Sequence, residues 1–209
     1  MRTIAYVDGF NLYFGALRKT PYRWLNLQRL IELHLMPHNQ LIGIKYFTAK
    51  LNPRPNDPDA PLRQEIYLRA LATLPNFEIM LGHFLTKTVR MLLANPAPGQ
   101  SPTAEVVKTE ENGSDVNLAV QLLHDAHLDR FDCGVVVSGD SDLLMPVRIV
   151  RDELKKVVGV LNPQRHPCAV LKAHATFYKH LRRNFIAAAQ FPDTLADPRG
   201  TFTKPTAWV

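Results

Sequence analysis

Short apolar runs alternate with stretches of helical periodicity along most of this chain, and that alternation constrains the fold more than any other feature. The apolar runs cover residues 3–7, 41–47, 77–85, 135–137 and 157–161, and the helical stretches cover residues 25–35, 62–74, 114–126, a segment ending at 154, and 168–183. Strands that alternate with helices form mostly parallel sheets with helices on both faces. The sequence therefore predicts an α/β fold with a mostly parallel central sheet.

The helical stretch 114–126 has a clear apolar pattern. Val116, Ala119, Val120 and Leu123 recur at helical spacing, so we expect them to form the buried face of this helix. Ser114 or Asp115 would cap its first turn.

Two further segments depart from the alternation. Residues 89–93 and 105–108 flank a proline-containing loop and could pair as a hairpin. The tail after Phe191 is rich in proline and threonine, which is typical of a poorly ordered or docked extension. With 209 residues, the chain is long enough for one sizeable core, and we expect a domain over residues 1–185 with an extension over 186–209.

Composition excludes few functions, but it bears on the location of the protein, the state of its cysteines and the charge of its partners. No apolar run is long enough to cross a bilayer and no signal peptide opens the chain, so we expect a cytoplasmic protein with no membrane contact. The two cysteines, Cys133 and Cys168, form no metal or disulfide pattern and are expected to be inert. A formal charge of +6 favours, slightly, a polyanionic partner.

Four aspartates stand where strands or loops lead into helices. Asp8 follows the first apolar run, Asp115 opens the helical stretch at 114, and Asp140 and Asp142 follow the run at 135–137. Helix capping is a competing role for Asp115 and Asp142, and a less natural one for Asp8. Because the functional crevice of a parallel α/β sheet lies at the carboxyl ends of its strands, we expect the four carboxylates to converge there.

Converging carboxylates repel one another unless a proton or a cation intervenes. An acidic cluster without cysteine or histidine favours Mg²⁺ or Mn²⁺, which prefer oxygen ligands. Such an ion can activate water and stabilise charge on a phosphate. The residues therefore predict a Mg²⁺ or Mn²⁺ site at one rim of the sheet.

Three motifs carry a family resemblance. The segments YVDGFNLYFG (6–15), NGSDVNLAVQLL (112–123) and VVVSGDSDLLMPVRIVRDELKKVVGV (135–160) resemble, in this order, the NYN domain, the LabA-like branch of the PIN-like nuclease superfamily. The resemblance spans nearly the whole of residues 3–183. It implies a Rossmann-like, three-layer α/β/α sandwich and metal-dependent cleavage of RNA.

The resemblance also implies roles for individual residues. Asp8, Asp115, Asp140 and Asp142 match the catalytic, metal-binding acids of the family, and Asn11 and Ser138 match its supporting polar positions. The residues before Asp115 depart from the family's pattern, and Glu111 just upstream could add a carboxylate. Many relatives have an Ala-Asp pair in the last helix, where this chain has Ala173-His174.

Contacts with RNA are expected from residues near these motifs. Tyr13 could stack on a base, and Lys108, Arg148 and Lys172 could contact the phosphate backbone. The exposed hairpin could also pair with a second copy, which would make the protein a homodimer.

Three functional hypotheses follow. The first is a metal-dependent ribonuclease, in the endonucleolytic mode. The second is an RNA- or protein-binding regulatory module with a weak or lost active site, and the third is a nuclease of DNA or of nucleotides. A GDSL-type hydrolase is excluded because no Asp-x-x-His follows, and haloacid dehalogenase and P-loop motifs are missing.

Overall fold

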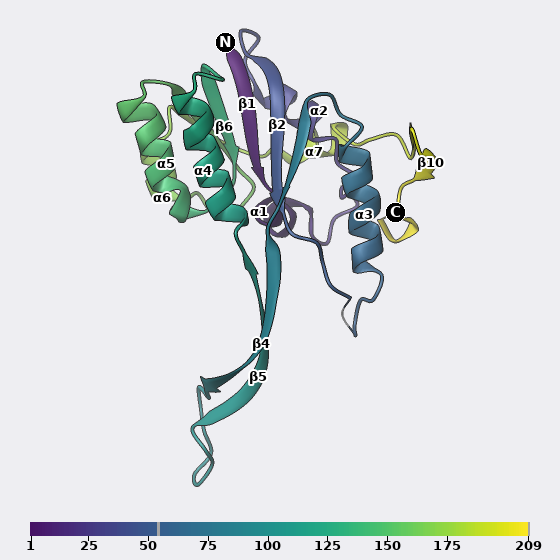
Figure 1. Ribbon diagram of the computed structural model, residues 1–209, viewed down its shortest axis with the longest axis vertical. Helices are drawn as coiled ribbons and strands as arrows, with labels where there is room; N and C mark the ends of the chain where they lie inside the picture. The colour runs from purple at the N-terminus through teal and green to yellow at the C-terminus, as the bar shows by residue number, and fades with distance from the viewer. Residues whose placement is uncertain (54, 209) are drawn as a thin grey trace.

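The computed structural model describes residues 1–53 and 55–208, and a six-stranded parallel sheet lies at its centre (Figure 1). Its strands are β1 (Arg2–Asp8), β2 (Gln40–Thr48), β3 (Phe77–Leu81), β6 (Cys133–Val137), β7 (Val157–Asn162) and β8 (Phe177–His180). Their order across the sheet is β3-β2-β1-β6-β7-β8. Strands β2 and β3 extend the sheet on one side of β1, and β6, β7 and β8 extend it on the other side. The prediction of an α/β/α sandwich with a parallel sheet is confirmed.

Two layers of helices cover the sheet, because successive residues of each strand point to opposite faces. Ile4 and Tyr6 of β1 face one core, and Ala5 and Val7 face the other. The first layer consists of α4 (Ser114–His127), η2 (Ser141–Leu143), α5 (Leu144–Arg148), η3 (Ile149–Glu153) and α6 (Ala169–His174). The second consists of α1 (Gly9–Leu12), η1 (Tyr13–Leu17), α2 (Leu27–His34), α3 (Ala60–Leu71) and α7 (Arg183–Ala188). None of the described helices is both long and apolar enough to cross a membrane.

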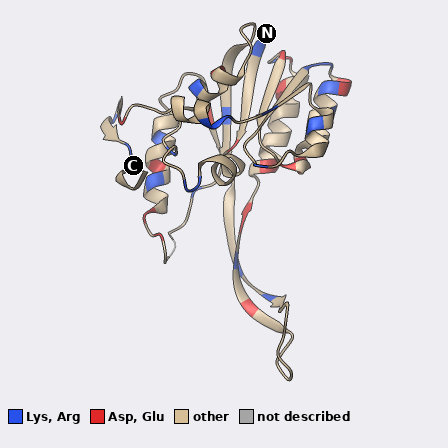
Figure 2. Ribbon diagram, turned by 180° about the vertical axis from the view of Figure 1, so that it is seen from behind, with Lys and Arg blue, Asp and Glu red and all other residues tan. Residues whose placement is uncertain are grey.

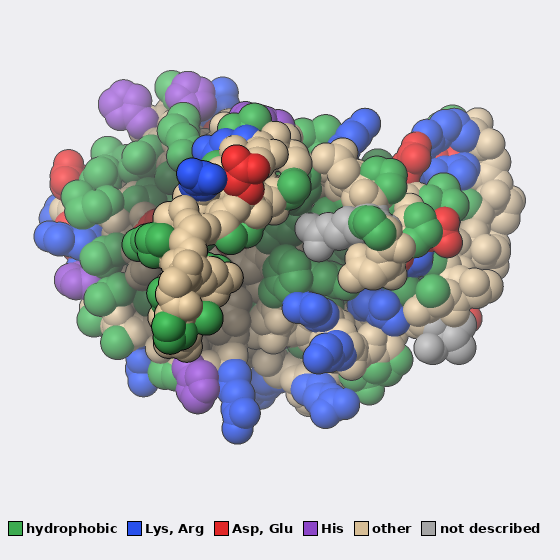
Figure 3. Space-filling model, turned by 90° about the horizontal axis from the view of Figure 1, so that it is seen from below, with side chains coloured by type: hydrophobic (Ala, Val, Ile, Leu, Met, Phe, Trp, Pro, Cys, Tyr) green, Lys and Arg blue, Asp and Glu red, His purple; other side chains and the backbone are tan. Residues whose placement is uncertain are grey.

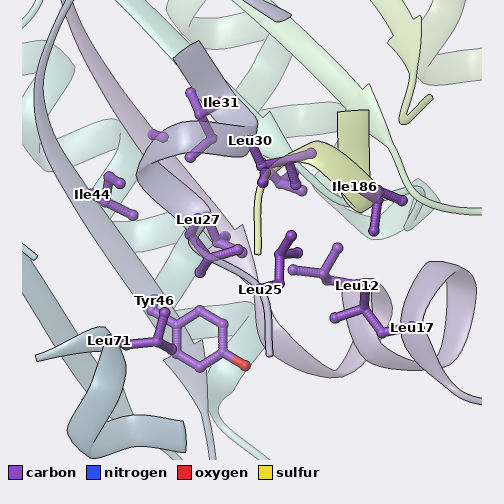
Figure 4. Close-up of a cluster of buried hydrophobic side chains, with 14 of the residues drawn as sticks. Leu12, Leu17, Leu25, Leu27, Leu30, Ile31, Ile44, Tyr46, Leu71 and Ile186 are labelled. Carbon is purple, nitrogen blue, oxygen red and sulfur yellow. The ribbon is translucent and has the colours of Figure 1, made fainter. Parts of the chain in front are cut away.

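The second layer holds the larger core. Leucine and isoleucine side chains from α1, η1, α2 and α7 form one cluster with Ile44 and Tyr46 of β2, part of which Figure 4 shows. Leu25, Leu27 and Leu30 are fully buried there. Burial of this apolar area is the main favourable term for folding of this layer.

The C-terminal tail is part of this core. Its chain forms a small hairpin of β9 (Thr194–Asp197) and β10 (Gly200–Thr203) and ends in η4 (Thr206–Trp208). Phe202 and Trp208 pack against Trp24, whose indole N–H donates to the carbonyl of Pro192. Of the two states expected for the tail, the structure has the docked one.

The expected last helix, over residues 168–183, was wrong. The chain instead forms the short helix α6 and the edge strand β8 in this segment, and α7 begins only at Arg183. Phe177 of β8 packs over Gly159 of β7, where a Cβ atom would lie inside the aromatic ring. Pairing with β7 completes the sheet, and this tertiary gain overrides the helical pattern.

The expected buried face of α4 is only partly buried, since Ala119 and Leu123 pack against the core but two valines do not. Leu118, Leu122 and Ala126 point into the core, while Val116 is 65% and Val120 is 59% exposed. The core face of α4 is therefore rotated from the expected one, and it leaves Val116 and Val120 exposed.

Strands β4 (His83–Leu92) and β5 (Thr103–Asn112) form an antiparallel arm that projects away from the body (Figure 1). The hairpin expected from the sequence is thus confirmed but is about twice as long as residues 89–93 and 105–108 suggested. Phe84 anchors the base of the arm by an edge contact with Phe10.

A buried ionic cluster ties α4 to the sheet. The carboxylate of Asp125 is fully buried and accepts hydrogen bonds from Tyr6 Oη at 2.7 Å and from Arg130 Nη1 at 2.8 Å. The ammonium group of Lys45 lies 2.8 Å from the same carboxylate. Burial raises the pKa of Asp125, but these three partners more than reverse the effect and the net pKa is lowered.

We predict that Asp125→Ala lowers the free energy of unfolding by about 3–5 kcal/mol, because it leaves the nearly buried Lys45 ammonium with no closer carboxylate than that of Glu78, 3.9 Å away. Urea denaturation measures the change. The matched control is Asp193→Ala, which removes an exposed carboxylate 3.7 Å from Lys204 and should cost at most about 1 kcal/mol. Equal losses in the two variants would contradict the role assigned to the cluster.

Candidate active site

The candidate site begins with Asp8, the last residue of β1. Its side chain is only 3% exposed, and both carboxylate oxygens accept a hydrogen bond. Oδ1 accepts from the backbone N–H of Asn11 at 2.9 Å, and Oδ2 accepts from Ser138 Oγ at 3.0 Å. Asp8 therefore caps α1 and also joins the carboxyl ends of β1 and β6. A close fit at Gly9 supports this turn, since a Cβ there would lie 2.6 Å from Tyr46 Oη.

Asn11 makes a second connection across the same strand ends. Its Oδ1 accepts from the backbone N–H of Gly139 at 2.9 Å and from Gln164 Nε2 at 3.0 Å. Gln164 did not figure in the sequence prediction. It follows β7 by two residues, so the rule that placed Asp8 and Asp140 at the rim would also have found it.

Asp115 lies in the first turn of α4, but it does not cap that helix. The N-cap is Gly113, in the left-handed region at φ 97°, and it has no side chain to accept a hydrogen bond. Glu111 takes over this task, because its carboxylate accepts from Ser114 N at 3.2 Å and Ser114 Oγ at 2.7 Å. The carboxylate of Asp115 has no part in these capping contacts.

Asp140 and Asp142 follow β6 on a short turn. Asp140 is the N-cap of η2, and its Oδ1 accepts from the backbone N–H of Asp142 at 3.0 Å. Asp142 is exposed. Capping thus falls on Asp8 and Asp140 and not on Asp115 or Asp142, the two for which it was the stronger alternative.

These side chains surround one hollow of about 240 Å³ that is open to solvent. The residues that line it are Asp8, Phe10, Asn11, Phe14, Glu111, Ser114, Asp115, Asp140 and Gln164. The hollow lies beside β1 and β6, where the strand order reverses, which is the usual position of a ligand site in such sheets. Asp142 is outside the lining, and Ser138 is buried behind it.

Burial and neighbouring carboxylates raise the pKa values of Asp8 and Asp115 in the hollow. Burial is the largest cause of the raised pKa of Asp8, which reaches about 6, and the charges of Asp115 and Asp140 add to it. The pKa of Asp115 is raised by burial and then by the charges of Asp140, Glu111 and Asp142. The hollow therefore favours any ligand that brings positive charge.

The donor set fits a hard cation in kind, since it consists of carboxylate and amide oxygens. Asp8, Asp115 and Asp140 are the ligands that the hollow offers. Across residues 1–53 and 55–208, however, no three or more His, Cys, Asp or Glu side chains already lie close enough together to hold a metal ion. The four-aspartate ligand set expected from the sequence is therefore not preassembled, and Asp142 does not line the hollow.

The expected RNA contacts lie outside the hollow. Tyr13 is 36% exposed and packs edge-on against Phe14. Lys108 is on the arm and pairs with Glu110 at 2.6 Å, Arg148 lies 4.0 Å from Asp152, and Lys172 is exposed on α6. None of the four lines the site, so their role stays a prediction.

The family model that matches this chain is that of the NYN domain, over residues 2–181. The chain belongs to the NYN domain family. The resemblance found in the sequence motifs is thereby confirmed, and it places the chain among the PIN-like nucleases. The boundary between the domain and the extension at residue 186 stays a prediction.

Two individual proteins are similar to this NYN domain protein. A 6-hydroxy-3-succinoylpyridine 3-monooxygenase, HspA of Pseudomonas putida, is 30% identical over 236 aligned residues, which cover 100% of this chain and 75% of that protein. A crystal structure of a protein of unknown function from Vibrio parahaemolyticus superposes with a TM-score of 0.53 at 18% identity. That alignment covers 88% of this chain and 94% of the other, and it shows a shared fold.

We predict that Asp8→Asn becomes more stable than the wild type as the pH rises. The folded protein keeps a proton on Asp8 up to a pH of about 6, whereas the unfolded chain releases it near 4. Stability from this group is thus present at low pH and lost between these values. The variant should gain about 3 kcal/mol over the wild type between pH 4 and 7, since each pKa unit is worth about 1.4 kcal/mol.

Urea denaturation in EDTA at both pH values measures this difference. Asp193→Asn, at an exposed carboxylate, serves as the control and should follow the wild-type profile. A constant difference between Asp8→Asn and the wild type across the range would refute the raised pKa.

Proposed function

We propose that this protein is a metal-dependent ribonuclease that hydrolyses phosphodiester bonds within RNA. The observation that carries the proposal is the convergence of Asp8, Asp115 and Asp140, from three separate segments, on one solvent-open hollow, where burial and the neighbouring carboxylates raise the pKa values of Asp8 and Asp115. Membership of the NYN family supports the reaction class.

Asp8, Asp115 and Asp140 would hold the cation, with Asp142 at the edge of the site. When bound, Mg²⁺ or Mn²⁺ supplies a polarised water and neutralises charge on the phosphate. The buried hydrogen bonds to Asp8 fix its carboxylate before any ion enters, which reduces the reorganisation that binding requires.

Asn11 would hold the scissile phosphate. Its carbonyl oxygen is occupied by Gly139 and Gln164, so the amide orientation is fixed and the amino group lies on the other side as a donor. Glu111 positions α4, because both of its oxygens bond to Ser114.

The surroundings of the hollow suit a single RNA strand. Phe14 is 56% exposed at the hollow and offers a surface for an unpaired base. Arg18, Lys19 and Arg165 are exposed on segments that follow η1 and β7, and Figure 3 shows Lys and Arg side chains gathered on the face seen along the arm. The hollow is open to solvent, which allows a chain to pass across it and favours an endonuclease.

We predict that the wild type cleaves a mixed RNA pool only with Mg²⁺ or Mn²⁺, and leaves 5′-phosphate and 3′-hydroxyl ends. Asp115→Asn and Asp140→Asn should each lower the cleavage rate by about 100-fold or more, since each removes a metal ligand. Gel analysis and mapping of the new ends measure the result. The control Asp152→Asn changes an exposed carboxylate paired with Arg151 and should keep the wild-type rate.

A parallel measurement separates catalysis from binding. Mg²⁺ should raise the melting temperature of the wild type but not of Asp115→Asn, because a cation that binds the folded state stabilises it. RNA affinity with no product, and no response to the metal, would favour the regulatory module. Equal cleavage of a matched DNA pool would favour a general nuclease.

A second candidate function rests on the relative from Pseudomonas putida, which matches this chain over its whole length. A monooxygenase inserts one atom of O₂ into its substrate and needs an electron donor to reduce the other to water. If this chain shared that activity, 6-hydroxy-3-succinoylpyridine would be consumed with O₂ and reduced nicotinamide.

We predict no such consumption above a protein-free control, measured by chromatography of the pyridine and by absorbance of the nicotinamide at fixed O₂. Substrate-dependent turnover by protein that cleaves no RNA would overturn the ribonuclease proposal in favour of oxygenation.

A further inference from the structure

Acidic and basic side chains are separated along this chain. Residues 9–31 and 154–192 contain eleven Lys and Arg side chains and no Asp or Glu, whereas residues 113–153 contain eight acidic side chains and three basic ones. Residues 83–112, in the arm, contain three of each kind, so their formal charges cancel. The attraction for a polyanion therefore comes from the two basic stretches.

The two basic stretches are neighbours in the fold. Gly15 of η1 packs on the loop between β7 and α6, where a Cβ atom would lie 2.9 Å from Gln164 Nε2 and 3.0 Å from the carbonyl carbon of Pro163. A second contact joins Asn26 N to the carbonyl oxygen of Ala189 at 2.8 Å. Figure 2 shows the body from behind, where Lys and Arg lie on the loops nearest the viewer. The basic stretches thus form one continuous side of the molecule.

One end of this basic side is the hollow. Phe14 and Gln164 both line the hollow, and the guanidinium of Arg18 lies 5.4 Å from the centroid of the Phe14 ring. Arg165 follows Gln164 and is exposed. Cationic groups therefore begin at the rim of the candidate site.

The other end is the turn after β8. His180 of β8 pairs with Asn162 of β7, and the next backbone N–H, that of Leu181, donates to the carbonyl oxygen of Asn162 at 2.9 Å. Arg182 and Arg183 come directly after and are exposed. They lie beyond the loop that holds Arg165, so the cations continue away from the hollow.

These exposed cations are called the basic track below. None of them forms an ion pair with a carboxylate of residues 1–53 or 55–208. Their charges are therefore available to a ligand. The basic track consists of Arg18, Lys19, Arg165, Arg182 and Arg183.

The hollow by itself repels a polyanion. Its lining includes the acidic side chains of Asp8, Glu111, Asp115 and Asp140. A single divalent cation offsets only two of these charges, so a strand that crosses the hollow has to be held by positive charge elsewhere. The basic track is the adjoining surface that supplies it, and Figure 3 shows Lys and Arg gathered on one part of the face seen along the arm.

We propose that the basic track holds an RNA strand on one side of the cleavage point. The strand would run from the hollow over η1 and the loop between β7 and α6 to the turn after β8, and the uncharged arm would lie outside this path. The identity of the strand as the substrate rests on the proposed ribonuclease function. Phe14, where the track meets the hollow, would stack on an unpaired base, which favours single-stranded over paired RNA.

Fluorescence anisotropy with a labelled oligouridine in EDTA tests the track, because no cleavage is expected without metal. Arg182→Gln with Arg183→Gln should raise the dissociation constant on the order of 10-fold at about 0.1 M salt. Arg18→Gln with Arg165→Gln should do the same at the other end. Each pair should also lower the dependence of log affinity on log salt by about 1.4, since one phosphate contact to a single strand contributes about 0.7.

The matched control removes two positive charges from the arm. Lys87→Gln with Arg90→Gln should leave the affinity and its salt dependence at the wild-type values. Phe14→Ala should weaken binding about 10-fold without changing the salt dependence, because the ring carries no charge, and Phe14→Trp should retain the affinity. Circular dichroism checks that each variant is folded.

Wild-type affinity in both arginine pairs would overturn the proposal. An equal loss in the arm control would also overturn it, because binding would then follow net charge and not position. Polyglutamate that competes as well as oligouridine at the same concentration of charge would point to an acidic protein partner instead.

Failure of the track can be told apart from failure of the proposed nuclease. A protein that cleaves no RNA, but loses affinity in both arginine pairs and not in the arm control, would retain the track and lose the enzyme. Metal-dependent cleavage that is unchanged in both pairs at low RNA concentration would retain the enzyme and overturn the track.

Discussion

The burial of one carboxylate at the junction of β1 and β6 is the constraint on which this site depends. Asp8 is nearly inaccessible, and burying a carboxylate is costly unless it is hydrogen-bonded. Asn11 N and Ser138 Oγ both donate hydrogen bonds to this carboxylate. The bond from Ser138 joins the ends of β1 and β6, which are 130 residues apart in sequence. The residual cost is visible in the raised pKa of Asp8, which makes the site receptive to a cation or a proton.

The base of the arm, the first turn of α4 and the candidate site are in direct contact with one another. Glu111, the second-last residue of β5, caps α4 through Ser114, and Gly113 after the strand makes the tight turn that only a residue tolerant of positive φ adopts easily. Asp115 is therefore positioned by the base of the arm as much as by the helix. Whatever the arm contacts can thus influence a wall of the hollow.

Parts of this structure could be predicted because they follow from local patterns. The strands β1, β2, β6 and β7 are short β-branched or aromatic runs, and their parallel order follows from the helices between them. Their shared carboxyl edge then predicts that Asp8 and Asp140 meet. Edge strand β8 could not be found in this way, because its residues also fit a helix and only pairing with β7 decides between the two.

The sequence by itself determined the family, the class of fold and the acidic character of one sheet edge, because residue types and their spacing carry that information directly. Tertiary structure decided which acids line the hollow, that Asp142 stays at its edge, and that Gln164 joins through Asn11. It also decided which face of α4 is buried. Apolar residues extend beyond the core face of that helix, so periodicity cannot fix its rotation, and only packing against the sheet selects Leu118 and Leu122 over Val116 and Val120.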